Sequence, residues 1–360
     1  MSALKPIFII HSLCGSRRPP SWSPSIYKCL LYNLYTITIA FLVSSLALSQ
    51  MIGMALNADA SNISDDIYLF LVQFVSCFKL LSLVVNRNNI VDLIVTLGQE
   101  PHQPLDDVEM NIHEKFDRLC RFNTNTYTSF VVFTVSNFLL LSLFTSFNKR
   151  ELTFQAWLPF EVNMAPIVFY LSYLHQMLAM ILGAVIHVAL DTIVWYLLIN
   201  ITCQIRILEN RLTNITNERK ATLKLCIRHH ECIYNFAAAV NETFKFTIFI
   251  QFSASTLTVC FTLIRLTSIS ANNLEFIKML LFMSGMLAQL YLYCSHGHLI
   301  TLKTNLMELS NDVKKSLLIM MRRTTRPIII IVMNLFPLNI DSFVSILKTA
   351  YSAYNFLEQT

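Results

Sequence analysis

Charge is scarce in this chain. Only 14% of its 360 residues are Asp, Glu, Lys or Arg, whereas soluble domains carry about 25%. Glycine is also rare, with six residues, which is too few for loops that cradle phosphates, and the HExxH, GxSxG, Walker A and GxGxxG motifs are missing. We therefore expect neither an enzyme nor a cofactor. The net charge of +5 is not clustered, which argues against nucleic-acid binding.

Cysteines are missing from the predicted outer loops, although the chain contains nine. This placement argues against an extracellular disulfide framework. One stretch, from Cys226 through His229 and His230 to Cys232, has the residue types of a metal site. No second ligand pair lies at zinc-ribbon spacing. We therefore predict no metal site and interpret the stretch as a solvated face of a cytosolic helix.

Apolar residues dominate what remains, at 54% of the chain and a mean hydropathy of +0.53. Seven apolar runs are long enough to cross a hydrocarbon core: 30–54, 67–86, 127–147, 166–199, 245–268, 276–298 and 338–357. Arginines interrupt the segment 316–335, and its remaining apolar run at 327–333 is too short to span. The sequence predicts an all-α membrane protein with seven transmembrane helices.

The distribution of Lys and Arg sets the orientation of these helices. With the N-terminus in the cytosol, the inside segments contain 21 of these residues and the outside segments contain two. Cytosolic loops carry the excess of positive charge, so we predict a cytosolic N-terminus and an extracellular C-terminus. The predicted regions are a cytosolic N-terminus (1–29), a six-helix ligand-binding membrane region (30–298), a cytosolic anchor segment (299–336) and a pore-lining seventh helix (337–360).

Two local patterns add detail to this topology. Helical periodicity continues through 226–240, so we expect helices to project from the membrane into the cytosol. A sequon at Asn62-Ile-Ser64 lies in the first predicted outer loop, where glycosylation is possible.

The last helix carries a polar stripe. Its polar residues recur every three or four positions and therefore share one face: Asp341, Ser345, Lys348, Ser352, Asn355 and Gln359. Lipid offers no hydrogen-bonding partners, so the stripe must face protein or water. It predicts a pore-lining or subunit-facing helix.

Aromatic, methionine and hydroxyl side chains are frequent in the predicted outer halves of the middle helices. Such adaptable apolar walls suit a small volatile or lipid-like ligand, although ordinary helix packing explains each residue individually. The candidate ligand-binding residues are Tyr68, Phe74, Phe138, Phe144, Tyr170, Tyr173, His175, Met177 and Met180. His187 and Asp191, four residues apart in the fourth span, favour a helix-capping or inter-helix hydrogen bond over a proton relay, because Asp191 is expected near the hydrated cytosolic interface.

Several segments resemble the insect odorant receptor family. The most specific is the C-terminal one, from Lys314 to Pro327, then Phe336-Pro-Leu and the run from Phe343 to Ser352. Ala156-Trp-Leu-Pro-Phe160, the entry to the fifth helix at 230–252, and Trp22 with Pro24 also resemble the family. The resemblance covers about 22–360, whereas residues 1–21 match nothing.

This resemblance implies a subunit of a tetrameric cation channel, formed with a shared co-receptor and gated by a volatile ligand in the membrane of olfactory neuron dendrites. It also implies an odorant pocket among helices two to six and a pore lined by the last helix. The family's gate positions fall here on Tyr354, Leu357 and Glu358, which do not coincide with the polar stripe. The stripe is then either the pore lining or a seam against the rest of the channel.

Two alternatives remain at this stage. A gustatory-type receptor channel shares the topology, but its C-terminal motif is absent here. A G-protein-coupled receptor is less consistent with the inverted charge distribution and the missing pair of outer-loop cysteines.

Overall fold

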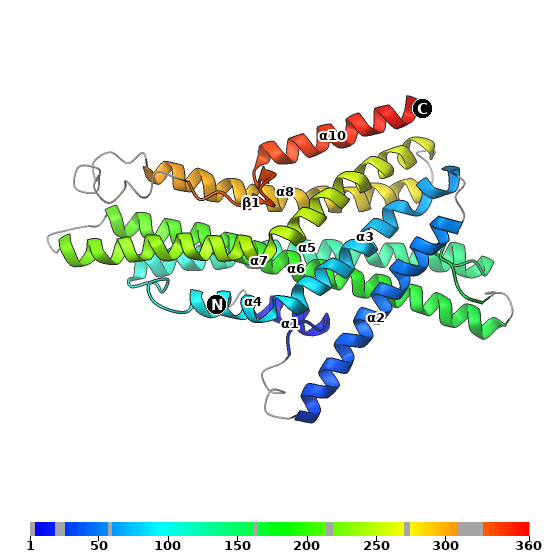
Figure 1. Cartoon of the computed structure of the whole chain (residues 1–360), viewed down its shortest axis with the longest axis horizontal. Helices are drawn as coiled ribbons and strands as arrows, with labels where there is room; N and C mark the ends of the chain where they lie inside the picture. Colours follow the sequence, from blue (N-terminus) through cyan, green and yellow to red (C-terminus); the bar gives the residue numbers. More distant parts are fainter. Residues whose placement is uncertain are drawn as a thin grey trace.

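The computed structural model describes residues 4–18, 26–56, 60–160, 165–213, 219–269, 274–308 and 327–359, and this part of the chain is almost entirely helical (Figure 1). The helices are α1 (Leu4–Leu13), α2 (Ile26–Leu56), α3 (Ala60–Val85), α4 (Arg87–Leu97), α5 (Asp107–Ser142) with its π-helical continuation η2 (Leu143–Phe147), α6 (Pro166–Thr213), α7 (Arg219–Ser268), α8 (Leu274–Glu308) and α10 (Ile340–Gln359). Two short antiparallel strands, β1 (Ile331–Val332) and β2 (Phe336–Pro337), precede α10.

Each predicted span coincides with one helix, except that Asn86 of the second span and Leu338 and Asn339 of the seventh lie outside the helical bounds. Among the described residues, six helices are long and apolar enough to cross a membrane, namely those of α2, α3, α5 with η2, α6, α7 and α8. The helix α10 covers most of the predicted seventh span, but it is not among these six. The all-helical membrane architecture is therefore confirmed.

The helices α6 and α7 are longer than a bilayer requires. At 48 residues, α6 is about 72 Å long, whereas a hydrocarbon core is about 30 Å thick. The helix α7 has 50 residues and runs through 226–240 without a break. The predicted helical extensions beyond the membrane are thus present.

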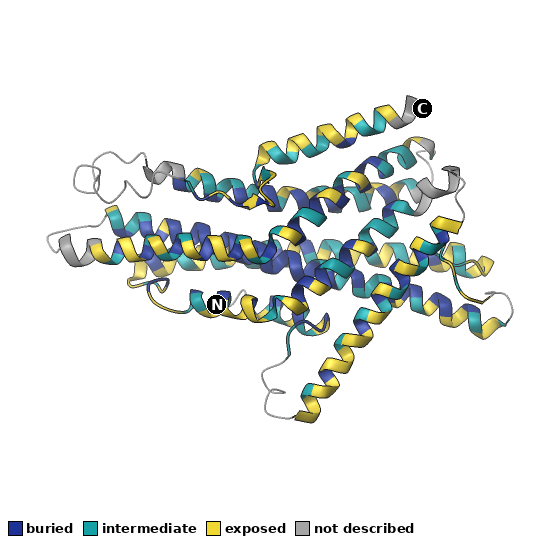
Figure 2. Ribbon diagram, viewed as in Figure 1, coloured by how far each residue is buried: buried dark blue, intermediate teal, exposed yellow. Residues whose placement is uncertain are grey.

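The core follows the inner half of α6. Nearly every residue from Ile186 to Leu208 is buried, on all faces of the helix (Figure 2). A helix that is apolar all round belongs in the interior of a bundle. Here α6 is surrounded by α1, α2, α3, α5, α7 and α8. By contrast, the first turns of α2 expose large apolar side chains such as Tyr27 and Leu30, as expected for contact with lipid.

A short hairpin precedes α10. From Ile328 to Val332, buried and exposed side chains alternate, which is the two-residue period of a strand. Met333 and Asn334 both have positive φ, and the Leu335 amide donates to the Val332 carbonyl, as in a type I′ turn. Within the run at 327–333, Ile331 and Val332 form a strand, and Ile328, Ile330 and Val332 pack against the core. The sequence alone shows only that this run is too short to span.

The helix α10 packs on α7 and α8 through its apolar face. Ala350 is buried with Val259 and Met286, and Phe343 and Ile346 contact the main core. Asp341, Ser345, Lys348 and Ser352 of the polar stripe are exposed, and Asn355 is half-buried. The stripe is therefore not the seam between α10 and the rest of its own chain. Figure 2 shows the exposed residues on the outer side of this helix.

Two further segments differ from expectation. Residues 4–13 form a helix, α1, that packs on α6, with Ile7 fully buried. No pattern in residues 1–21 predicts this contact. Asn62 lies in the first turn of α3 and not in the predicted outer loop, because α3 begins at Ala60. Its side chain lies outside the described residues, as do residues 309–326 of the predicted anchor segment.

Candidate functional site

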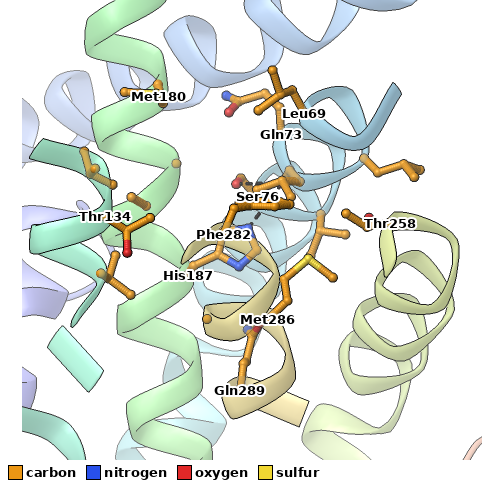
Figure 3. Close-up of a pocket in the computed structure, with 18 of the residues that line it drawn as sticks. Leu69, Gln73, Ser76, Thr134, Met180, His187, Thr258, Phe282, Met286 and Gln289 are labelled. Atoms are coloured by element: carbon orange, nitrogen blue, oxygen red, sulfur yellow. Dashed lines mark hydrogen bonds between the residues drawn. The ribbon is translucent and has the colours of Figure 1, made fainter. Parts of the chain in front are cut away.

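A cavity of about 170 Å³ lies among α2, α3, α5, α6, α7 and α8. Its walls are mostly aliphatic, aromatic and methionine side chains, among them Phe138, Met180, Phe282 and Met286 (Figure 3). Small-molecule sites are typically concave and apolar with a few placed polar groups. This cavity fits that description, and it lies among the helices that were expected to hold a ligand.

One part of the lining depends on a glycine. A Cβ atom at Gly183 of α6 would lie 2.9 Å from Oε1 of Gln73 and 3.2 Å from Oγ of Ser76. The missing side chain therefore lets the polar groups of α3 approach α6 closely. Any larger residue at position 183 would push Gln73 into the cavity.

Beside the cavity lies a buried ion pair. The Lys79 Nζ atom of α3 lies 2.6 Å from Oδ1 of Asp191 on α6, and both side chains are fully buried. Asp191 also accepts hydrogen bonds from Tyr127 (3.2 Å), from Tyr293 (2.8 Å) and from the side-chain amide of Gln289. The expected inter-helix hydrogen bond is confirmed, whereas the expected hydration of Asp191 is wrong. Tyr127 and Gln289 also line the cavity, so the network and the cavity share residues.

The structure brings only some of the predicted ligand-binding residues together. Phe138 and Met180 line the cavity, and Tyr68 lines two neighbouring cavities together with Phe138. The Tyr68 ring meets Phe282 edge-on at 5.4 Å between centroids. The aromatic and methionine walls predicted from the sequence are therefore present at these positions.

The remaining candidates lie elsewhere. Phe74, Phe144 and Tyr170 are exposed on the outside of the bundle, because their helices turn them away from it. Tyr173 is buried and bonds Ser142 at 2.7 Å. His175 bonds Ser45 of α2 at 2.8 Å. Met177 packs in a separate apolar cluster. None of these six lines the cavity among α2, α3 and α5–α8.

Most of the polar lining was not expected from the sequence; only His187 was singled out, as a partner of Asp191 and not as a ligand-binding residue. Gln73 and Ser76 lie on α3, His187 on α6, and Gln251 and Gln289 on α7 and α8. The signal was present in the sequence, since amide and imidazole groups are rare within apolar spans and mark candidate sites. Their convergence depends on helix rotation, which the sequence does not specify.

A second polar cluster lies in the helical extensions. Arg211 of α6 binds Glu109 of α5 through Nε and Nη2, each at 2.8 Å. Its remaining donors reach the carbonyls of Pro101 and Gln103 and Nδ1 of His229, which in turn bonds Gln204 at 2.9 Å. All five guanidinium N–H groups are thus used. The cluster joins α5, α6, α7 and the loop at 98–106.

His229 corrects the interpretation of the Cys226–Cys232 stretch. His229 and Cys226 are both buried, so this face of α7 is not solvated. Burial lowers the pKa of His229 to about 3, with Arg211 acting in the same direction. Groups of three or more candidate metal ligands do not occur among the described residues.

The gate candidates are only partly described. Tyr354 is half-buried, and its ring lies 6.1 Å from that of Tyr351. The backbones of Leu357 and Glu358 belong to α10, and their side chains lie outside the described residues, as does that of Gln359. The roles of these residues stay predictions.

Comparison with known proteins identifies relatives of this chain. The family model described as 7tm odorant receptor matches residues 59–351. Odorant receptor 94a of Drosophila melanogaster is 30% identical over 224 residues, which span 58% of this chain and 57% of that relative. Odorant receptor Or1 of Anopheles gambiae is 21% identical over 263 residues, spanning 61% and 63% of the two chains. The chain thus matches somewhat more than half the length of each of these relatives.

The fold also matches solved structures. The insect olfactory receptor OR5 from Machilis hrabei in complex with eugenol superposes with a TM-score of 0.86 at 18% identity. The match covers 99% of this chain and 97% of that one. The same receptor without that ligand in its description gives a TM-score of 0.82 at 16% identity. The arrangement of helices is therefore that of an insect olfactory receptor.

Proposed function

Because this chain belongs to the seven-transmembrane odorant receptor family, a family of receptors and not of enzymes, we propose that it is the ligand-specific subunit of an odorant-gated, non-selective cation channel. The observation that carries this proposal is the cavity, which is enclosed by membrane helices and adjoins the helices on which α10 packs. Its volume and mostly apolar walls suit a small volatile molecule.

Aromatic contacts connect the cavity region to α10. Tyr293 donates a hydrogen bond to Asp191, and its ring centroid lies 6.1 Å from that of Phe252 of α7. The Phe252 ring centroid lies 5.5 Å from that of Phe336 in the hairpin. Tyr291 of α8 meets Phe343 of α10 edge-on at 5.9 Å. A ligand that fits the cavity better in one arrangement of α7 and α8 shifts the population toward that arrangement. We propose that the shift moves α10 and opens the pore.

The exposed polar stripe of α10 supports a place beside water or another subunit. Lipid would leave Asp341 and Lys348 without partners, and their own chain does not cover them. We assign the stripe to the pore side or to the subunit interface, and the constriction to Tyr354, Leu357 and Glu358. The assembly is a heterotetramer with the shared co-receptor.

Topology and location follow from the same proposal. The protein is a multi-pass membrane protein, with its N-terminus in the cytosol, its C-terminus outside and its site of action in olfactory neuron dendrites. Figure 1 supports this orientation, because the C-terminus lies at the end of the bundle where α7 connects to α8, a connection with no Lys or Arg at 269–273. Asn62 then lies on the extracellular side of the membrane, where glycosylation can occur.

Recording currents from cells that co-express this chain with the co-receptor tests the proposal. We expect an odorant panel to evoke cation current in excised patches, with G-protein signalling blocked. Currents that vanish under this block, and are absent from excised patches, would contradict a channel. A tag at Thr360 should stain intact cells, and its absence from surface-expressed protein would overturn the orientation.

A further inference from the structure

Three of the hydroxyl groups that line the cavity already donate their protons within the protein. Ser76, Thr134 and Thr258 each donate to a carbonyl four residues earlier in the same helix, at 3.0, 3.0 and 2.8 Å. A hydroxyl has one proton and two lone pairs. These groups therefore offer only lone pairs to a ligand. Ser255 is the described lining hydroxyl without such a donated bond.

The side-chain amides of Gln251 and Gln289 are committed to the Asp191 network. A carboxylate only accepts, so Gln289 turns its NH₂ to Asp191 and its carbonyl oxygen to Gln251. Gln251 therefore donates to that oxygen through its own NH₂ group, which also donates to the Ser255 hydroxyl oxygen at 2.7 Å. Gln251 Oε1 is then left buried without a hydrogen-bond partner within the described chain. A buried acceptor of this kind is costly unless something donates to it.

His187 is a further acceptor. Its Nε2 atom lies 3.2 Å from the Val72 carbonyl, and a carbonyl cannot donate, so the proton is on Nε2. The neutral ring then has a lone pair on Nδ1, for which the described residues supply no donor. Figure 3 shows the ring in the cavity beside Ser76, Phe282 and Met286.

We propose that this cavity selects small apolar molecules that carry a hydroxyl donor, with His187 Nδ1 as the acceptor and Gln251 Oε1 as a second acceptor beside the Asp191 network. This inference rests on the proposed function and names the ligand class of that site. An ether or ketone of the same shape cannot donate to either acceptor. Both acceptors then stay buried and unpaired, which costs affinity relative to the hydroxyl compound.

Size narrows the class further. An apolar cavity of about 150 Å³ takes up benzene, and this cavity holds about 170 Å³. A single ring with small substituents therefore fits. Simple phenols and small cyclic alcohols have the donor, the apolar body and the size.

Matched ligand pairs test this inference. In cells that express the chain with the co-receptor, we compare 3-methylphenol with 3-methylanisole, and cyclohexanol with cyclohexanone. We expect the hydroxyl compound of each pair to act at about tenfold lower concentration, as the loss of one hydrogen bond to a buried acceptor implies. Equal potency within both pairs, or greater potency of the ether and ketone, would overturn the inference.

Variants assign the acceptor. We expect His187→Leu to reduce the tenfold preference to about onefold to threefold. Gln251→Met, which keeps the length of the side chain, should reduce it less. Met286→Leu is the matched control, because it changes a lining side chain without changing an acceptor, and it should shift both members of a pair equally. An unchanged preference in both His187→Leu and Gln251→Met would refute the assignment.

A binding readout separates this inference from channel function. The purified full chain is heated with each compound, and the shift of its melting temperature is measured. Greater stabilisation by the hydroxyl compounds in the absence of any current would refute the channel proposal and support the ligand class. Current evoked by other odorants without a hydroxyl preference would do the reverse. A His187→Leu chain that does not reach the cell surface is compared by the same melting assay after purification.

Discussion

The two buried charge clusters are built in opposite ways. In the membrane, the hub is an anion: Asp191 accepts from side chains on α3, α5 and α8, all within the bundle. In the helical extensions the hub is a cation: Arg211 donates to one carboxylate, one imidazole and two backbone carbonyls. The first cluster ties helices to one another beside the ligand cavity. The second cluster binds a loop to the helices near the end of α6, and its residues do not line the cavity.

The largest effect is expected in the membrane cluster. Lys79→Met leaves Asp191 charged and buried without its counter-ion, which costs about 3–5 kcal/mol of stability. We expect loss of surface expression and a lower melting temperature in detergent. The double variant Lys79→Met with Asp191→Asn removes both charges, keeps an acceptor for the neighbouring donors and should recover most of this loss. A double variant as unstable as the single one would show that the ion pair itself stabilises the fold.

A smaller loss is expected in the helical extensions. Arg211→Met leaves Glu109 buried without its partner, at a cost of about 2–3 kcal/mol, since water reaches a site outside the membrane more readily. The loop at 98–106 loses two anchoring bonds and should become susceptible to limited proteolysis. The matched control is Arg206→Met, whose ion pair with Glu209 is exposed and contributes little. Equal protection of the loop in both variants would contradict the anchoring role.

Acidification separates the clusters further. The pKa of His229 is lowered to about 3 in the folded chain by burial, and that of His102 is lowered for the same reason. Between this value and the ordinary value near 6.5, the unfolded state binds more protons, so stability falls as the pH falls. At pH 5.5 we expect His229 to cost roughly 1 kcal/mol. His229→Gln keeps an acceptor and a donor, and its melting temperature should change less between pH 7.5 and 5.5.

The smallest effect concerns the start of α5. Asp106 caps this helix by accepting from the Glu109 amide at 2.7 Å, and the Glu109 carboxylate accepts from the Leu105 amide at 2.8 Å. Asp106→Ala should cost about 1 kcal/mol, seen as a lower melting temperature, and should loosen the carboxylate that binds Arg211. Asp106→Asn retains a capping oxygen and should lose only a few tenths of that amount. Equal losses in both variants would assign the effect to charge and not to the cap.

The sequence predicts the spans well, because each apolar run is long and each is bounded by polar segments. The lining is another matter. Phe138 faces the cavity, whereas Phe144, six residues on, is exposed. These two residues lie about 240° apart around a helix, and the composition of α5 does not say which direction is inward. The inner half of α6 has no polar face at all, so periodicity cannot orient it.

Other features were hidden for different reasons. The strand that begins the hairpin has too few residues for its alternation to be recognised among the isoleucines of 328–331. Lys79 and Asp191 lie 112 positions apart, and no local pattern pairs them. The burial of His229 depends on Arg211 of α6 and His102 of a loop, both distant in sequence. Long-range partners, rather than local propensity, therefore decide the polar chemistry of this protein.

One contact near the start of α10 has a mechanical consequence. A Cβ atom at Gly297 of α8 would lie 2.1 Å from the Leu338 carbonyl oxygen, so the bare backbone of α8 is the surface on which the chain entering α10 rests. That contact holds one end of a 20-residue helix, which is about 30 Å long, so α10 would tilt about this point. A tilt of about 5° there carries the far end through roughly 2.6 Å. Because Gly297 has no side chain, a small rearrangement of α8 acts directly on the chain entering α10 and becomes a larger displacement at the far end of α10.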